Sequence, residues 1–150
     1  MNEFAVVLLH LALEVLAAFV GTCCFAMVFC VPKRHYLACG VDGAVGWLVY
    51  AVLMLLQPST VLATLVAAVP LTLLARIFAV TLKAPVTVFL LCGIFPLVPG
   101  AGIYYTAYHF IQGDTVASAA KGAETLKIAC ALAIGISLVL GLPMPRHKKR

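Results

Sequence analysis

Long apolar stretches, separated by short polar or proline-containing segments, fill almost all of this 150-residue chain. Hydrophobic residues make up 65% of the sequence and charged residues only 10%, whereas a soluble domain carries roughly 25% charged residues. A helix needs about 20 apolar residues to cross the hydrocarbon core of a bilayer. The pattern therefore predicts an all-α integral membrane protein that forms a single membrane domain over residues 1–150.

Five transmembrane helices are predicted from these stretches, with approximate bounds 4–31, 36–56, 59–81, 86–112 and 115–142. The second stretch opens with Gly40, Gly43 and Gly46. Small residues at three-residue spacing let another helix approach closely. We therefore expect the second helix to pack tightly against a neighbour.

If the chain crosses the membrane five times, its basic residues lie on one side of the membrane. That side holds Lys33-Arg34, Arg76 with Lys83, and the basic tail at 143–150; the other side holds Glu3, Gln57 and Asp114. Because cytoplasmic loops carry the excess of Lys and Arg, the N-terminus is expected outside and the tail in the cytoplasm. The basic residues do not form a patch with interleaved aromatics, so the expected partner is the lipid bilayer and not a nucleic acid.

The segment Pro96-Leu97-Val98-Pro99-Gly100 interrupts the fourth predicted helix. Each proline removes a backbone donor and clashes with the carbonyl group four residues earlier. In a bilayer, freed backbone groups are tolerated only where protein or a hydrated cavity covers them. A broken membrane helix near mid-depth is typical of a transporter binding site. We expect this break either to bind substrate or to act as a hinge for the helix that does.

Gly102, Tyr104, Tyr105 and Tyr108 follow the break. The second half-helix is expected to begin near Pro99 or Gly100, and its free N–H groups carry partial positive charge that can receive a carboxylate. Tyr104 and Tyr108 share a helix face and would add hydroxyl donors. The predicted substrate-binding residues are thus Pro96, Pro99, Gly100, Gly102 and Tyr104. The alternative is a proline kink with its tyrosines in the outer aromatic belt.

Glu14 places a carboxyl group deep in the first predicted helix, where an unpaired charge is costly. His10 lies four residues earlier on the same helix face. One hypothesis is that Glu14, tuned by His10, couples transport to proton movement. The alternative is an interior polar contact that fixes helix packing.

Three charged residues, Lys121, Glu124 and Lys127, fall within one arc of the fifth predicted helix. They are interpreted either as a charged lining for an anionic substrate or as an interfacial face in the outer leaflet. Glu124 and Lys127 are spaced to form an ion pair at i,i+3.

Two further charged residues lie near the cytoplasmic ends of their helices. Arg76 is expected to extend to the interface as an anchor, with a role as substrate ligand the alternative. Asp42 is expected to pair with Lys33, Arg34 or Arg76, or to be solvated.

The remaining motifs favour neither an enzyme nor a metalloprotein. Most of the six cysteines lie in apolar stretches, where packing is the expected role; a soft-metal site at Cys23 and Cys30 is the weaker alternative. The sequence has no nucleophile–base pair, HExxH, P-loop or dinucleotide fingerprint. We therefore expect no catalytic residues, no metal and no cofactor.

Several segments together resemble the threonine/serine exporter family: residues 25–34, Gly43 and Gly46, residues 95–104, and residues 134–136. The match is to the five-span C-terminal domain of that family, here as the separate small subunit of a split exporter, similar to that of a bacterial succinate exporter. Glu14 falls where relatives can carry an acidic residue, whereas Cys30 replaces the asparagine expected before Val31-Pro32.

This resemblance implies a subunit of a secondary-active exporter of threonine, serine or small organic acids, driven by the proton gradient. It also implies a larger membrane subunit of the same family as partner, and a multi-pass location in the bacterial inner membrane. The alternative function is a structural or assembly subunit that does not itself transport.

Overall fold

The computed structural model describes residues 3–56 and 59–143, and all regular secondary structure in these residues is helical, without a strand. The helices are α1 (Glu3–Val28), α2 (Tyr36–Leu55), α3 (Thr60–Thr81), α4 (Val86–Gly93), α5 (Gly100–Ile111) and α6 (Thr115–Leu140), with two short 3-10 helices, η1 (Lys33–His35) and η2 (Phe95–Leu97). Gln57 and most of the basic tail, residues 144–150, lie outside the described residues.

Four of these helices, α1, α2, α3 and α6, are long and apolar enough to cross a membrane. The segments Val86–Leu97 and Gly100–Ile111 form a bent pair at 54° to each other, and they make a fifth span when taken as one. The prediction of an all-α membrane protein with a broken fourth helix is confirmed. The bend has the predicted cause, because Pro96 and Pro99 cannot continue a regular helical hydrogen-bond ladder.

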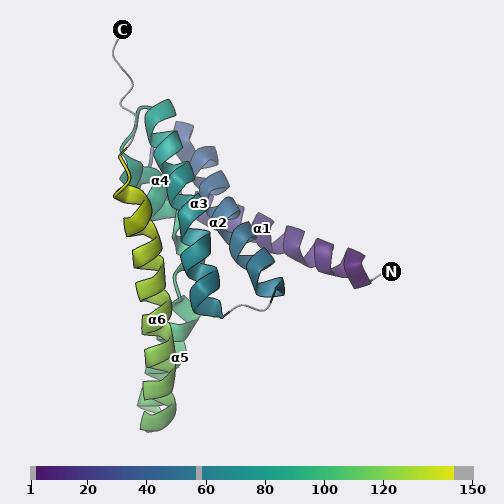
Figure 1. Ribbon diagram of the computed structural model, residues 1–150, viewed down its shortest axis with the longest axis vertical. Coiled ribbons are helices and arrows are strands. Elements are labelled where there is room, and N and C mark those ends of the chain that lie inside the picture. The colour runs from purple at the N-terminus through teal and green to yellow at the C-terminus, as the bar shows by residue number, and fades with distance from the viewer. Residues whose placement is uncertain (1–2, 57–58, 144–150) are drawn as a thin grey trace.

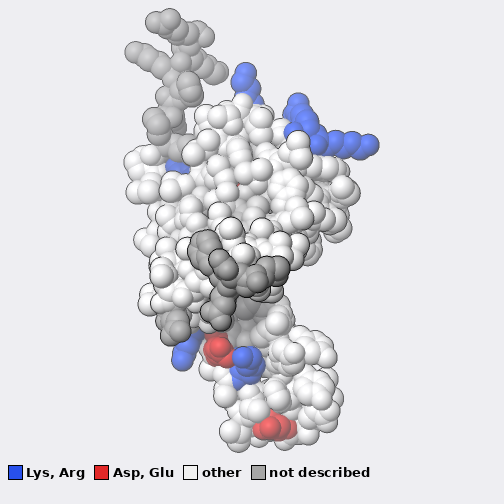
Figure 2. Space-filling view, turned by 90° about the vertical axis from the view of Figure 1, so that its right-hand side faces the viewer, with Lys and Arg blue, Asp and Glu red and all other residues white. Residues whose placement is uncertain are grey.

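The helices form a bundle from which two parts extend (Figure 1). α3 packs against α2, α4 and α6. The N-terminal half of α1 extends away from the other helices, and the α5–α6 hairpin reaches beyond the α2–α3 connection (Figure 1). Figure 2 shows basic side chains at the end of the molecule where the chain passes from α1 to α2, and mixed charges towards the hairpin.

Glycines allow the closest helix contacts, as the spacing on α2 predicted. A Cβ atom at Gly43 would lie only 2.1 Å from Thr22 Oγ1 of α1, and one at Gly46 would lie 2.5 Å from Leu71 Cδ1 of α3. At Gly135 of α6, an added Cβ would lie 2.8 Å from the backbone oxygen of Leu65. In the absence of a hydrophobic driving force within lipid, such close approach supplies the van der Waals contact that holds membrane helices together.

The break is anchored to the interior through η2. Leu97 is buried in an apolar cluster with Ala67, Ala68, Leu71 and Leu132, which come from α3 and α6. A second cluster, built around Cys39, Phe89 and Cys92, packs α4 against α2. The first half of the broken helix is therefore held firmly in the bundle, and the break begins directly beside the core.

Candidate functional site

A cavity of about 330 Å³ lies beside the break, and side chains from four helices line it; we call it the polar cavity. The break contributes residues 96–102, and the other helices contribute Trp47 and Tyr50 (α2), Thr60 and Thr64 (α3), and Lys121, Glu124, Thr125 and Ile128 (α6). Four of the predicted substrate-binding residues line this cavity together: Pro96, Pro99, Gly100 and Gly102. The structure adds the partners that the sequence could not supply.

The backbone of the break offers hydrogen-bond donors to this cavity. The Gly100 N–H donates to the Val98 carbonyl at 2.7 Å, and the Ile103 N–H donates to the Pro99 carbonyl at 3.1 Å. Between them, the N–H groups of Ala101 and Gly102 have no backbone acceptor among residues 3–56 and 59–143. The first N–H groups of a helix lack intrahelical partners, and here two of them border the cavity.

Lys121 and Glu124 bring opposite charges to the same cavity. Their side chains form an ion pair of 2.8 Å and remain about half exposed. Lys127 is exposed and does not line the cavity. The expected Glu124–Lys127 pair is therefore wrong. Because helical side chains lean towards the N-terminus, Glu124 reaches back over Lys121 and not forward to Lys127.

Glu14 lies next to Trp47, one of the residues that line the polar cavity. His10 Nε2 is 3.1 Å from Glu14 Oε1, and the indole N–H of Trp47 donates to Glu14 Oε2 at 3.3 Å. A cavity of about 240 Å³ is lined by Glu14, Trp47 and Pro96 together. Trp47 therefore connects the intramembrane carboxyl group to the break.

Trp47 and Tyr50 are site residues that the sequence analysis missed. Both line the polar cavity and also a cavity of about 510 Å³ next to His10 and Glu14. The available signal was the single tryptophan in the middle of an apolar helix, because a buried indole N–H needs an acceptor. Nothing in the sequence, however, indicated that this acceptor would be Glu14.

Tyr104 lies apart from the polar cavity. It is 63% exposed and stacks on Tyr108 with the ring centroids 6.3 Å apart, while Tyr105 packs against its edge. These three rings form an exposed aromatic face on α5. The structure thus brings the backbone of the break to the cavity but not this tyrosine.

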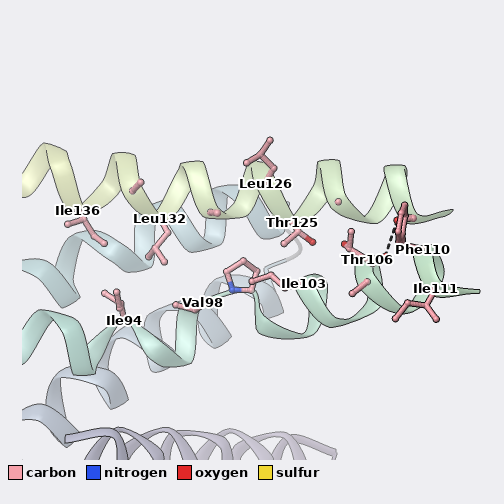
Figure 3. Close-up of a pocket in the computed structure, with 16 residues that line it drawn as sticks. Ile94, Val98, Ile103, Thr106, Phe110, Ile111, Thr125, Leu126, Leu132 and Ile136 are labelled. Atoms are coloured by element: carbon pink, nitrogen blue, oxygen red, sulfur yellow. Dashed lines mark hydrogen bonds between the residues drawn. The ribbon is translucent and has the colours of Figure 1, made fainter. Parts of the chain in front are cut away.

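A larger, apolar cavity of about 900 Å³ lies on another face of the break, between α5 and α6. Figure 3 shows Leu132 and Ile136 of α6 facing Ile94 and Val98 across it. Its Thr125 hydroxyl group already donates to the Lys121 carbonyl at 2.7 Å. This cavity therefore suits apolar groups, whereas the polar cavity suits a charged ligand.

Arg76 and Asp42 are both buried, in surroundings that the sequence did not indicate. Arg76 is only 8% exposed, and its guanidinium donates to the carbonyl groups of Val139 and Leu142 at the end of α6. It does not line the polar cavity; its contacts cap the end of α6, where the last carbonyl groups need donors and attract a cation. Asp42 is fully buried, so solvation is wrong, and neither of its oxygens has a hydrogen-bond partner in the described chain.

The six cysteines are all free thiols. No group of three or more His, Cys, Asp or Glu side chains that could hold a metal ion is found within residues 3–56 and 59–143.

The fold and the site define a multi-pass helical membrane protein in which a broken helix borders a polar cavity, an arrangement typical of secondary transporters. The family model described as "Threonine/Serine exporter, ThrE" matches residues 14–141. The chain belongs to this family and is therefore an exporter-type transporter. Comparisons with curated proteins and with solved structures gave no match.

Proposed function

We propose that this chain is the small subunit of a secondary-active exporter of threonine, serine or small organic acids, driven by the proton gradient. The observation that supports this proposal is the polar cavity, where the backbone of the break meets Lys121 and Glu124. Family membership supports the transport class. The substrate, the driving ion and the partner are parts of the proposal.

The chemistry of the polar cavity favours an amino acid. A substrate carboxylate would accept hydrogen bonds from Lys121 and from the N–H groups of Ala101 and Gly102, while Glu124 would receive the ammonium group. Charge-assisted hydrogen bonds of this kind are the strong ones. A dicarboxylate would meet repulsion from Glu124. The volume of about 330 Å³ is at the lower end of the roughly 300–1,000 Å³ of ligand pockets, which fits a small substrate.

Glu14 is the proton-coupling residue of the proposal. When it is ionised, its carboxylate holds both His10 and the indole N–H of Trp47. Protonation of Glu14 weakens both contacts, because hydrogen bonds to ionised acceptors are the stronger ones. Trp47 is then free to reorient at the polar cavity, so a proton bound at Glu14 alters the substrate site through the indole.

The proposed partner is a larger membrane subunit of the same family, in the bacterial inner membrane, with the N-terminus of this chain outside and its C-terminus in the cytoplasm. The side chains of His10 and Glu14 are 76% and 36% exposed on α1, which extends away from the bundle (Figure 1). Polar groups in a membrane helix almost always face protein or a water-filled cavity. A partner covering this part of α1 would remove them from lipid.

Export from cells tests the proposal. Cells expressing the chain with its partner should release labelled threonine or serine faster than cells lacking both, with labelled succinate as the competing substrate. The double variant Pro99→Ala with Gly100→Leu should abolish release while both proteins persist in the membrane. A loss of release that only follows a loss of the complex would instead favour the structural or assembly role.

Two charge-neutralising variants on α6 test whether substrate binds in the polar cavity. Lys121→Gln should raise the KM for the exported acid about tenfold or more, since one charge-assisted hydrogen bond is worth roughly 1.5–3 kcal/mol. Lys127→Gln is the matched control on the same helix and should leave KM unchanged. Equal effects of the two variants would contradict substrate binding at the polar cavity.

Glu14→Gln tests the coupling. The variant should still exchange substrate across the membrane at equal pH, but it should lose the acceleration that a pH gradient gives. An unchanged dependence on the gradient would show that Glu14 is not the coupling residue.

A further inference from the structure

Asp42 is a buried carboxyl group that the proposed transport steps do not use. It lies on α2, is 0% exposed, and neither oxygen has a hydrogen-bond partner in the part of the chain that the structure describes. α4 approaches it at Gly93, where an added Cβ would lie 2.2 Å from Asp42 Oδ2. The absence of a side chain at Gly93 is what allows α4 to cover the carboxyl group.

The surroundings of Asp42 contain no compensating charge. The titratable and charged groups on the elements packed around this part of α2 are Cys23 and Cys24 of α1, Lys33, Arg34 and His35 of η1, Arg76 of α3 and Cys92 of α4, with Tyr36 and Cys39 on α2 itself. Lys33 and Arg34 are exposed, and the Arg34 Nε–H donates to His35 Nε2 at 3.0 Å. Arg76 is engaged with the end of α6, and His35 packs on Phe89. The ion pairs within the described residues are His10–Glu14 and Lys121–Glu124, so none involves Asp42.

An ionised carboxylate in this environment would carry a large desolvation cost without any compensating contact. The neutral form has a much smaller cost, so the conformation seen here is one in which Asp42 holds a proton. Ionisation requires water or a cation at the carboxyl group, and α4 blocks that access at Gly93.

Gly93 also lies at a mechanically important place. It is the last residue of α4, and Ile94 and η2 follow it directly. Any movement of the break that shifts the end of α4 also uncovers Asp42. The access of water to the carboxyl group is thus linked to the geometry of the broken helix.

We propose that Asp42 is a reversible proton-binding site, closed and protonated while Gly93 packs against it and ionised when the end of α4 moves away. On opening, the proton passes from the carboxyl O–H to an entering water molecule, and the remaining carboxylate is hydrated. The use of this proton in export rests on the proposed function, whereas the binding and release of the proton do not.

Infrared spectroscopy of the purified full chain in lipid nanodiscs tests the protonation. At neutral pH, the wild type should show the C=O band of a protonated carboxyl group, and Asp42→Asn should lose it. Asn has nearly the shape of protonated Asp, so the variant should fold. Asp114→Asn is the matched control: Asp114 is exposed and accepts from the Ala117 N–H at the start of α6, a role that Asn also fills, and the band should remain. A wild-type spectrum identical to that of Asp42→Asn would overturn the proposal.

Two measurements test whether α4 closes off Asp42: hydrogen–deuterium exchange of its carboxyl proton, and a substitution at Gly93. In the wild type, the band should shift slowly after transfer to D₂O, because α4 excludes water; an immediate shift would overturn the closed state. Gly93→Ala should weaken the band at neutral pH and speed its exchange, whereas Gly100→Ala, which has no atom within 4 Å of the added Cβ, should change neither. A folded Gly93→Ala variant with an unaltered band and exchange rate would overturn the role of Gly93.

These measurements separate the two proposals. If the wild type exports none of the tested acids, the proposed function fails, yet the band and its exchange still decide whether Asp42 binds a proton. If the band is absent, the Asp42 proposal fails whatever the export assay shows.

Discussion

The two halves of the broken helix are packed in opposite ways. α4 buries Phe89, Cys92 and Gly93 and packs against both α2 and α3, whereas α5 has no buried residue and packs chiefly against α6. The break thus separates a fixed half from a half that is held by one neighbour. Because local opening is easiest where few buried contacts are lost, we infer that α5 moves first and that, within α4, only the end next to the break moves with it.

This contrast gives the two proposed functional groups different settings. Asp42 lies against the fixed half, in a closed apolar environment. Lys121 and Glu124 lie against the mobile half, at a cavity that α5 partly encloses. A movement of α5 would reshape the polar cavity first, and it would reach Asp42 only through η2 and the end of α4.

The largest loss of stability is expected at Gly135, where α6 packs against α3 in the bundle. An alanine there places its Cβ 2.8 Å from the backbone oxygen of Leu65, and a backbone atom cannot rotate away. Gly135→Ala should therefore separate α3 from α6 and lower the free energy of unfolding by about 3 kcal/mol, near the upper end of overpacking costs. Thermal unfolding in detergent measures this loss. A loss of unfolding free energy no larger than that of Gly100→Ala would contradict tight packing between α3 and α6.

An intermediate effect is expected at Arg76, which joins α3 to the end of α6. Arg76→Leu removes the donors to the Val139 and Leu142 carbonyl groups and should cost about 2 kcal/mol of unfolding free energy. Arg76→Lys keeps the charge and should restore part of that loss. Hydrogen exchange measured by mass spectrometry should show faster exchange at the C-terminal end of α6 in Arg76→Leu. Uniform exchange along the helix would contradict the capping role.

The smallest effect is expected in the mobile half, at Gly102. Its added Cβ would lie 2.3 Å from Thr125 Oγ1, but a side-chain hydroxyl group can rotate or shift. Gly102→Ala should cost about 1 kcal/mol, at the lower end of overpacking costs, and Thr125→Ala in the same chain should recover most of it. Comparing the three unfolding curves checks this order. A loss at Gly102 equal to that at Gly135 would mean that α5 is as firmly packed as the bundle.

Much of the fold could be predicted from local sequence. The apolar stretches are long enough for membrane helices, and Pro96, Pro99 and Gly100 mark the bend because proline interrupts a helix wherever it packs. The contact of His10 with Glu14 followed from their four-residue spacing. These features depend on neighbours within one or two helical turns.

The composition of the site depended on contacts between distant residues. Trp47 and Glu14 are 33 positions apart, and Arg76 reaches carbonyl groups 63 and 66 positions further along the chain. A charged residue near a helix end can be an interfacial anchor, part of an ion pair or a helix cap. The sequence does not distinguish these roles, because they depend on the neighbouring helix. The expected surroundings of Asp42 and the expected partner of Lys127 were wrong for this reason, and the sequence did not indicate the capping contacts of Arg76.

The sequence by itself therefore determined that this protein is a multi-pass helical membrane protein with a helix broken at Pro96–Gly100, since hydrophobic length and proline geometry are local properties. Only the tertiary structure decided what the break faces. Helix packing placed Lys121, Glu124 and Trp47 around it and closed Gly93 over Asp42. The physical reason is that glycine spacing in the sequence predicts that helices can pack closely, but it does not fix how they are aligned. The alignment of the neighbouring helices determines which side chains meet.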